Sequence, residues 1–320
     1  MLTSAPVVQI HLSRFCNFRC LHCYSSSGPS ERNSLPVPDL LHMTAKLIQA
    51  GYQRVSLSGG EPVLAPGFSE LARGLAEQGF RVAVITNGSR LTPVLDAMKE
   101  GILHHTSVSF DGPQSMHDKV RAKSGSFDLA KSTLQSLADA GQSCGAVLSA
   151  TRSSLPHLPD LVDLVCASGA SHVQLHPIAS TGRAKRNIQD VGPELPSEAL
   201  LRLVAMTRLF QRIYPAVHFQ ADVVLGQDLR TVSHDQDELI SPLVITDDGV
   251  LVPFCFDISR DFSLGQFHNY RGNFQLGVRL QQLLNTATEE ITEQPAASFY
   301  RELVTLSQIP SPDGIRAQCI

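Results

Sequence analysis

Three cysteines near the amino terminus have a spacing that suggests chemistry. Cys16, Cys20 and Cys23 form a C-x-x-x-C-x-x-C run directly after an apolar, strand-like segment. Thiolates are soft ligands that select iron–sulfur clusters, zinc or Cu(I). Structural zinc is normally closed by four ligands, and only His22 or His11 could supply a nearby fourth. A [4Fe–4S] cluster held by three cysteines would have one open iron, where a reactive molecule can bind.

A second motif follows the next predicted strand, at residues 54–57. It reads Gly59-Gly60-Glu61-Pro62. Two adjacent glycines let a backbone pass close to a ligand. The carboxylate of Glu61 can accept hydrogen bonds from a cationic group, although by itself the motif is also compatible with a glycine-rich turn carrying a solvated Glu.

Together, the cysteine spacing, Tyr24 directly after the third cysteine and the Gly-Gly-Glu-Pro motif resemble the radical S-adenosylmethionine (SAM) superfamily. The resemblance implies a [4Fe–4S] cluster on the three cysteines, with the amino and carboxylate groups of SAM on the open iron. It implies that electron transfer from the cluster cleaves SAM to a 5′-deoxyadenosyl radical, which abstracts hydrogen from a substrate. Tyr24, Gly59, Gly60 and Glu61 would help to seat SAM, with Glu61 accepting from its amine.

Strands and helices alternate along the first half of the chain. After the first strand, we predict strands at residues 54–57, 81–85, 106–110, 145–149 and 172–176, with helices between them. Such alternation predicts parallel β/α units, whose functional loops lie at the carboxyl ends of the strands. The cysteines, Gly-Gly-Glu-Pro, Thr-Asn-Gly and Ser-Phe-Asp-Gly all fall there. We therefore expect an α/β fold, a partial (β/α)6 TIM-type barrel over residues 1–190.

Four further residues at strand ends are candidates for the site. The segment 117–128 resembles the connector after the fourth strand in radical SAM peptide and cofactor maturases, and Ser180-Thr181-Gly182-Arg183-Ala184 resembles the segment that closes their barrel. By this resemblance, Ser109 and Arg183 are candidates for contact with SAM, Arg183 through its planar fork of donors, although it could also be a surface arginine. No catalytic residue is identified. His176 and Asp111 are candidates, and Asp111 could instead be a turn-forming residue.

The chain beyond residue 190 follows a different pattern. Residues 243–252 are typical of a hairpin around Asp-Gly. With the Pro-x-Cys that follows, the hairpin resembles the start of the SPASM or twitch appendage, which carries auxiliary iron–sulfur clusters in many relatives. Only Cys255 and Cys319 remain in this region, and Cys144 and Cys166 are expected to be buried, inert thiols. We expect residues 191–320 to form a small α+β appendage without an auxiliary cluster, closed by helices at 276–284 and 297–306.

Composition narrows the class of protein. The 320 residues carry a formal net charge of −4, so the overall charge gives no indication of binding to nucleic acid or to an anionic membrane. No run is long enough to span a bilayer, and seven cysteines, an odd number with three clustered, argue against a secreted disulfide scaffold. We expect a cytoplasmic protein.

The resemblance implies a radical SAM enzyme that acts on a peptide or small molecule in the synthesis of a ribosomally made peptide, a cofactor or another natural product. An electron donor such as flavodoxin or ferredoxin would serve it. The missing auxiliary cysteines and the lack of a leader-binding domain before the barrel lean away from peptide substrates. The alternative is a non-catalytic iron–sulfur or zinc protein that binds or senses.

Overall fold

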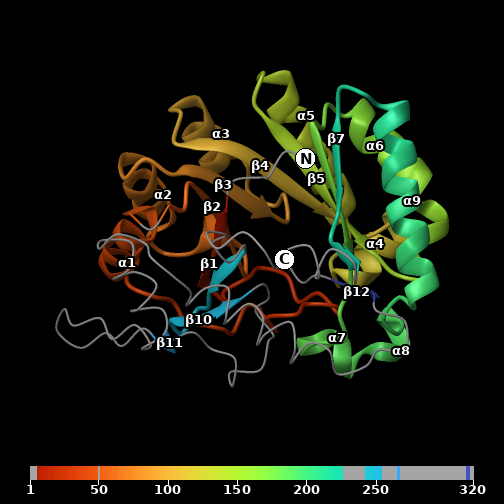
Figure 1. The fold of residues 1–320 in the computed structure, drawn as a ribbon, viewed down its shortest axis with the longest axis horizontal. Coiled ribbons are helices and arrows are strands. Elements are labelled where there is room, and N and C mark those ends of the chain that lie inside the picture. Colours follow the sequence, from red (N-terminus) through yellow and green to blue (C-terminus); the bar gives the residue numbers. More distant parts are fainter. Residues whose placement is uncertain (1–5, 50, 226–241, 254–264, 267–314, 318–320) are drawn as a thin grey trace, which may run out of the picture.

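Six parallel strands, each followed by at least one helix, form the centre of the fold (Figure 1). The structure is a computed structural model that describes residues 6–49, 51–225, 242–253, 265–266 and 315–317. The central strands are β1 (Val7–Ser13), β2 (Arg54–Gly59), β3 (Arg81–Thr86), β4 (Leu103–Phe110), β5 (Cys144–Ala150) and β6 (His172–Pro177). The helices between and after them are α1 (Val37–Gln49), α2 (Phe68–Glu77), α3 (Leu91–Lys99), α4 (Gln114–Val120), α5 (Ser126–Asp139), α6 (Leu158–Ala167), α7 (Gly182–Arg186), α8 (Ile188–Val191) and α9 (Ser197–Ile213), with 3-10 turns η1 (Pro62–Leu64) and η2 (Leu155–His157). The predicted α/β alternation is confirmed.

Later parts of the chain extend this sheet at both edges. The additional strands are β7 (His218–Ala221), β8 (Val223–Leu225), β9 (Leu243–Ile245), β10 (Val250–Pro253), β11 (Gly265–Gln266) and β12 (Ile315–Ala317). The sheet order is β11-β10-β9-β1-β2-β3-β4-β5-β6-β7, and β8 pairs separately with β12. The hairpin expected at 243–252 is present as antiparallel β9 and β10, and β9 pairs in parallel with β1. The sheet therefore runs across the proposed boundary at residue 190, and the division into two domains stays a prediction.

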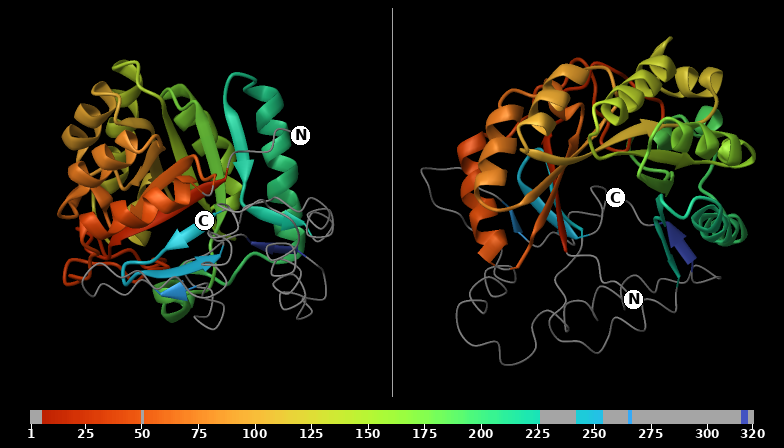
Figure 2. Two further views of the ribbon diagram at one scale, coloured as in Figure 1. Left: turned by 60° about the vertical axis from the view of Figure 1, so that its left-hand side comes forward. Right: turned by 90° about the horizontal axis from the view of Figure 1, so that it is seen from above.

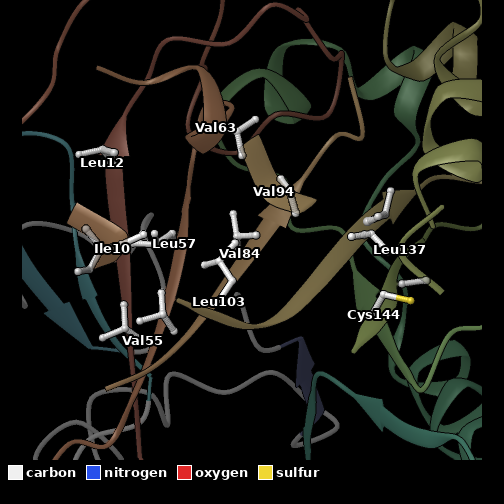
Figure 3. Packing of buried hydrophobic residues seen from close by; sticks show 14 of the residues in the cluster. Ile10, Leu12, Val55, Leu57, Val63, Val84, Val94, Leu103, Leu137 and Cys144 are labelled. Atoms are coloured by element: carbon white, nitrogen blue, oxygen red, sulfur yellow. The ribbon is translucent and has the colours of Figure 1, made fainter. Parts of the chain in front are cut away.

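The sheet is curved, and the helices cover its convex face (Figure 2). Alternate residues of a strand point to opposite faces. In β1 the fully buried Val8, Ile10 and Leu12 belong to the apolar core between strands and helices, part of which Figure 3 shows. Gln9, between them, faces the lumen of the partial barrel, where it lines two cavities. The apolar core thus lies between the strands and the helices, while the inner face carries mostly polar side chains.

The first helix, α1, starts at Val37, and Asp39 lies within its first turn. The predicted helices at 276–284 and 297–306, together with Cys255 and Cys319, lie outside the described residues. No helix in the described part of the chain is long and apolar enough to cross a bilayer.

Candidate functional site

One pocket at the carboxyl ends of the barrel strands gathers most of the predicted site residues. Its wall includes Cys16, Cys20, Cys23, Tyr24, Gly59, Gly60, Ser109, His176 and Arg183. Glu61 and Asp111 are not among the described residues that line this pocket. Each bonds to a residue that does line it, Glu61 to Asn87 and Asp111 to His22. Because parallel strands end at one edge of a barrel, loops far apart in sequence meet here.

The loop that carries the cysteines is fastened by residues after β6. The Arg183 Nε atom donates to the carbonyl oxygen of Cys20 at 2.8 Å, and the Arg183 backbone N–H donates to that of Cys23 at 2.9 Å. Asn187 Nδ2 donates to the carbonyl oxygen of Leu21 at 3.0 Å. In this structure the side chain of Arg183 therefore holds the loop, while its contact with a cofactor stays a prediction.

The two adjacent glycines allow a close approach between two parts of the chain. A Cβ atom at Gly60 would lie 2.0 Å from the carbonyl oxygen of Phe15, and one at Gly59 would lie 2.6 Å from that of Ser13. Gly59 also has φ +111°, a conformation that side chains rarely adopt. The amides of Gly60 and Glu61 donate to Ser13 O and Phe15 O at 2.7 and 2.8 Å. The glycines thus let the end of β2 bond directly to the start of the cysteine loop.

Glu61 links the ends of two strands. Its carboxylate accepts hydrogen bonds from Thr86 Oγ1 and the Asn87 backbone N–H, both at 2.7 Å. Burial raises the pKa of Glu61 to about 7, although these hydrogen bonds pull it down. Both oxygens are already engaged by the loop after β3, so the predicted contact with the SAM amine would have to share them. That contact stays a prediction.

Asn87 joins the same loop to the cysteines. Its Nδ2 lies 3.8 Å from Cys16 Sγ and donates to Asn17 Oδ1 at 3.0 Å. Its Oδ1 accepts from the Ser89 backbone N–H at 2.9 Å, which fixes the orientation of the amide. A hydrogen-bond donor therefore points at the sulfur of the first cysteine, the arrangement that tunes the electronics of a bound cluster.

The cysteines supply donors of the right chemistry for a cluster. Burial raises the pKa of Cys16 to about 11 and of Cys20 to about 12, with Arg121 opposing the increase, so neither is a thiolate at neutral pH without a metal. Binding would have to displace protons. In the described part of the chain, no three His, Cys, Asp or Glu side chains converge as a single metal ion requires. Three thiolates in the wall of one pocket are soft donors of the kind that hold an iron–sulfur centre.

A buried ionic network supports the loop from below. Asp111, at the end of β4, accepts from Arg121 Nε at 2.6 Å and pairs with His22 Nε2 at 2.8 Å. Burial would raise the pKa of Asp111, but Arg121 and His22 hold it well below its usual range. The Asp111 backbone N–H donates to His117 Nδ1 at 3.2 Å. Because His22 lies between the second and third cysteines, Asp111 fixes the position of the loop.

The two other predicted cofactor contacts face the lumen. The Tyr24 hydroxyl lies 3.3 Å from His11 Nε2 and 3.4 Å from Ser58 Oγ, beneath the cysteine loop. Ser109 Oγ donates to Thr86 O at 3.3 Å. Both residues line the pocket, as their place at strand and loop ends predicts, and their roles stay predictions.

His176 lies on the opposite wall and is oriented by a buried carboxylate. Its Nδ1 is 2.9 Å from Asp222 Oδ2, and Asp222 is fully buried just after β7. Asp222 also accepts from Gln174 Nε2 at 2.7 Å and Gln220 Nε2 at 3.0 Å. A carboxylate on Nδ1 favours the tautomer with its proton there, which makes Nε2 the acceptor.

Sequence reasoning missed three of these residues. Arg121 belongs to the quoted connector, where a His-Asp-x-x-Arg pattern could have marked it, and Asn87 belongs to the strand-end Thr-Asn-Gly. Asp222 had no local signal, because it meets His176 only through the pairing of β6 with β7.

Comparison with known proteins agrees with this geometry. The family model described as "Radical SAM superfamily" matches residues 10–168. A "Fe-coproporphyrin III synthase" of Methanosarcina barkeri is 27% identical over 215 residues, which cover 66% of this chain and 54% of that protein. The "Mycofactocin maturase MftC" of Mycobacterium tuberculosis is 30% identical over 194 residues, 59% of this chain and 49% of the relative. The chain spans about half the length of the curated relatives it matches.

Solved structures show the same fold. Streptococcus suis SuiB bound to S-adenosylmethionine superposes with a TM-score of 0.69 at 14% identity, covering 98% of this chain and 70% of that one. The structure titled "Native anSMEcpe with bound AdoMet" gives 0.61 at 14% identity, covering 94% and 84%. At these identities the likeness establishes the fold.

Proposed function

This chain belongs to the radical SAM superfamily, through its domain at residues 10–168, and we propose that it is a radical SAM enzyme that abstracts hydrogen from a peptide or small-molecule substrate. Members of the family use a [4Fe–4S] cluster and SAM. When bound, these groups supply a 5′-deoxyadenosyl radical, and the protein supplies binding, orientation and the exclusion of water.

We propose that Cys16, Cys20 and Cys23 hold the cluster. The observation that carries this proposal is that all three cysteines line one pocket together with Gly59 and Gly60, which come from a different strand end. The loop is held at its backbone, so its thiols can turn toward a ligand while their positions along the wall are kept.

SAM would lie beside the cluster, between the cysteine wall and the strand ends. We propose Tyr24, Ser109 and the backbone of Gly59-Gly60 as its contacts, with Arg183 acting mainly through the loop. Arg121 is a further candidate. It lines the pocket, is 5% exposed, and carries a permanent positive charge suited to a carboxylate.

On the substrate side we propose His176 as the acid–base residue and Asp222 as its positioning residue. An imidazole oriented by a carboxylate in this way can accept or return a proton at the substrate. Asp111 is the less suitable candidate, because both of its oxygens are engaged by Arg121 and His22.

Two classes of substrate are consistent with the relatives. The names "Mycofactocin maturase" and "Sporulation killing factor maturation protein SkfB" indicate maturation, and SuiB was solved with a precursor peptide. The Methanosarcina relatives are named as haem and Fe-coproporphyrin synthases. We propose a peptide or a cofactor precursor, with a flavodoxin or ferredoxin as the electron donor.

Anaerobic reconstitution of the full chain tests the proposal. We expect about four irons per chain, an electron paramagnetic resonance signal that changes on addition of SAM, and 5′-deoxyadenosine after addition of dithionite and SAM. Cys20→Ala should lose most of its iron. Cys144→Ala, which removes a buried thiol outside the pocket, should keep it.

Two other outcomes would contradict parts of this proposal. A cluster that ignores SAM and yields no 5′-deoxyadenosine would indicate the binding or sensing alternative. About eight irons per chain would refute the proposal of a single cluster. A second cluster would draw on Cys255 and Cys319, which lie in the part of the chain that the structure does not describe.

A further inference from the structure

A second cavity, of about 640 Å³, occupies the amino-terminal end of the barrel lumen. It lies at the starts of the strands, at the opposite end from the cysteines. Gln9, Ile85 and Gln174 line both this cavity and the cysteine pocket, so the two share a wall. The volume falls within the range of small-molecule sites.

Two exposed arginines, Arg54 and Arg81, give this cavity its positive charge. Three histidines, His104, His105 and His172, also line it, and none of its described lining residues is Asp or Glu. Arg54 and Arg81 are direct neighbours in the parallel register of β2 and β3. Neither guanidinium has an ion pair with a described residue. Like charges on adjacent strands repel, and an anion between them would relieve that repulsion.

Buried donors without partners line the same space. Gln9 is 2% exposed, and its Nε2 has no hydrogen-bond partner among the described residues. His105 Nε2 is also buried and lacks a described partner. Buried polar groups are normally satisfied, so each such atom calls for an explanation. The Gln9 amide group is a donor, and His105 Nε2 is a donor in the tautomer whose Nδ1 accepts from Ser143 Oγ at 2.9 Å, so both atoms lack an acceptor.

We propose that this end of the lumen binds a small oxyanion, the phosphate or carboxylate group of a small molecule. Arg54 and Arg81 hold its charge at the rim, and Gln9 and His105 donate to it from the floor. Burial lowers the pKa of His105 and His172 to about 4, with a further lowering from Arg54 at His105 and from His218 at His172. At neutral pH both are therefore neutral imidazoles with a single N–H. The site does not depend on the cluster and would exist in a protein of either proposed function.

Isothermal titration of the full-length protein tests this site, with inorganic phosphate and with citrate as probes at constant ionic strength. We expect saturable binding of one or both, which also identifies the preferred oxyanion. Arg54→Gln and Arg81→Gln should each weaken binding at least tenfold. Arg73→Gln is the matched control, because Arg73 is an exposed arginine that pairs with Glu100 on the helical side of the sheet. It should bind as the unmodified protein does.

Gln9→Leu provides an independent measurement on the floor of the cavity. Removing an unsatisfied buried donor should raise the melting temperature without the probe and lower the affinity for it. The proposal is overturned if neither probe binds saturably, if chloride at the same ionic strength competes equally, or if the Arg54 and Arg81 variants bind as Arg73→Gln does.

Discussion

The buried pair of Asp111 and Arg121 should be strongly coupled, and a double-mutant cycle can measure the coupling. Their side chains are 2% and 6% exposed, and Arg121 Nε lies 2.6 Å from Asp111 Oδ2. Removing one partner of a buried pair leaves the other charge without compensation, which typically costs about 3–5 kcal/mol. We expect Arg121→Met and Asp111→Asn each to lower the free energy of unfolding by about that amount.

The double variant should lose much less than the sum of the two changes, because no unpaired charge remains. Arg73 and Glu100 form the matched control, with the same 2.6 Å distance but side chains 55% and 51% exposed. Exposed pairs contribute about 0–1 kcal/mol, so their coupling should be several times smaller. The two pairs differ in burial and in the additional contact between Asp111 and His22.

Urea unfolding of the metal-free protein at neutral pH, followed by circular dichroism, is the suitable assay, because the chain has no Trp for fluorescence. Strict additivity in the Asp111–Arg121 cycle, or a coupling no larger than that of the surface pair, would refute the reasoning. Because the network also holds His22, the single variants should take up less iron on reconstitution.

Three further predictions concern the supporting structure. Gly60→Ala should prevent cluster assembly and lower the melting temperature, because its Cβ would lie 2.0 Å from the carbonyl oxygen of Phe15. Gly28→Ala is the control and should be tolerated, because its Cβ would have no neighbour closer than 3.9 Å. Equal melting temperatures and equal iron contents of the two variants would contradict this reasoning. Burial lowers the pKa of His11 from 6.5 to about 3. Between these pH values the His11 side chain is protonated in the unfolded protein but not in the folded protein, so stability is lost as the pH falls from 6.5 toward 3. Between pH 8 and pH 5 this loss is about 2 kcal/mol, and urea unfolding of His11→Gln should show a correspondingly flatter pH dependence. The Asp118 carboxylate accepts hydrogen bonds from the backbone N–H groups of Gly125 and Phe127, at 2.7 and 2.9 Å, at the start of α5. Asp118→Ala should therefore lower the free energy of unfolding by about 1 kcal/mol, measured by urea unfolding. An unchanged free energy of unfolding would show that Asp118 does not stabilise the start of this helix.

The sequence by itself determined the class of fold and the chemistry of its main loop. The alternation of apolar strands with amphipathic helices specifies parallel β/α units, because both periods are local properties of the chain. The cysteine spacing and the Gly-Gly pair could also be recognised from the sequence, because each is a pattern of only a few consecutive residues. In the structure the glycines approach the carbonyl oxygens of Ser13 and Phe15, and their expected approach to a ligand stays a prediction.

Only the tertiary structure decided which side chains work together. Asp222 reaches His176 because β7 joins the sheet beside β6, and no local spacing specifies that pairing. Glu61 and Arg183 are polar residues at strand ends, but their hydrogen bonds go to Thr86 and to the backbone of Cys20. Partners across a sheet depend on strand order and register, which follow from the packing of the whole core.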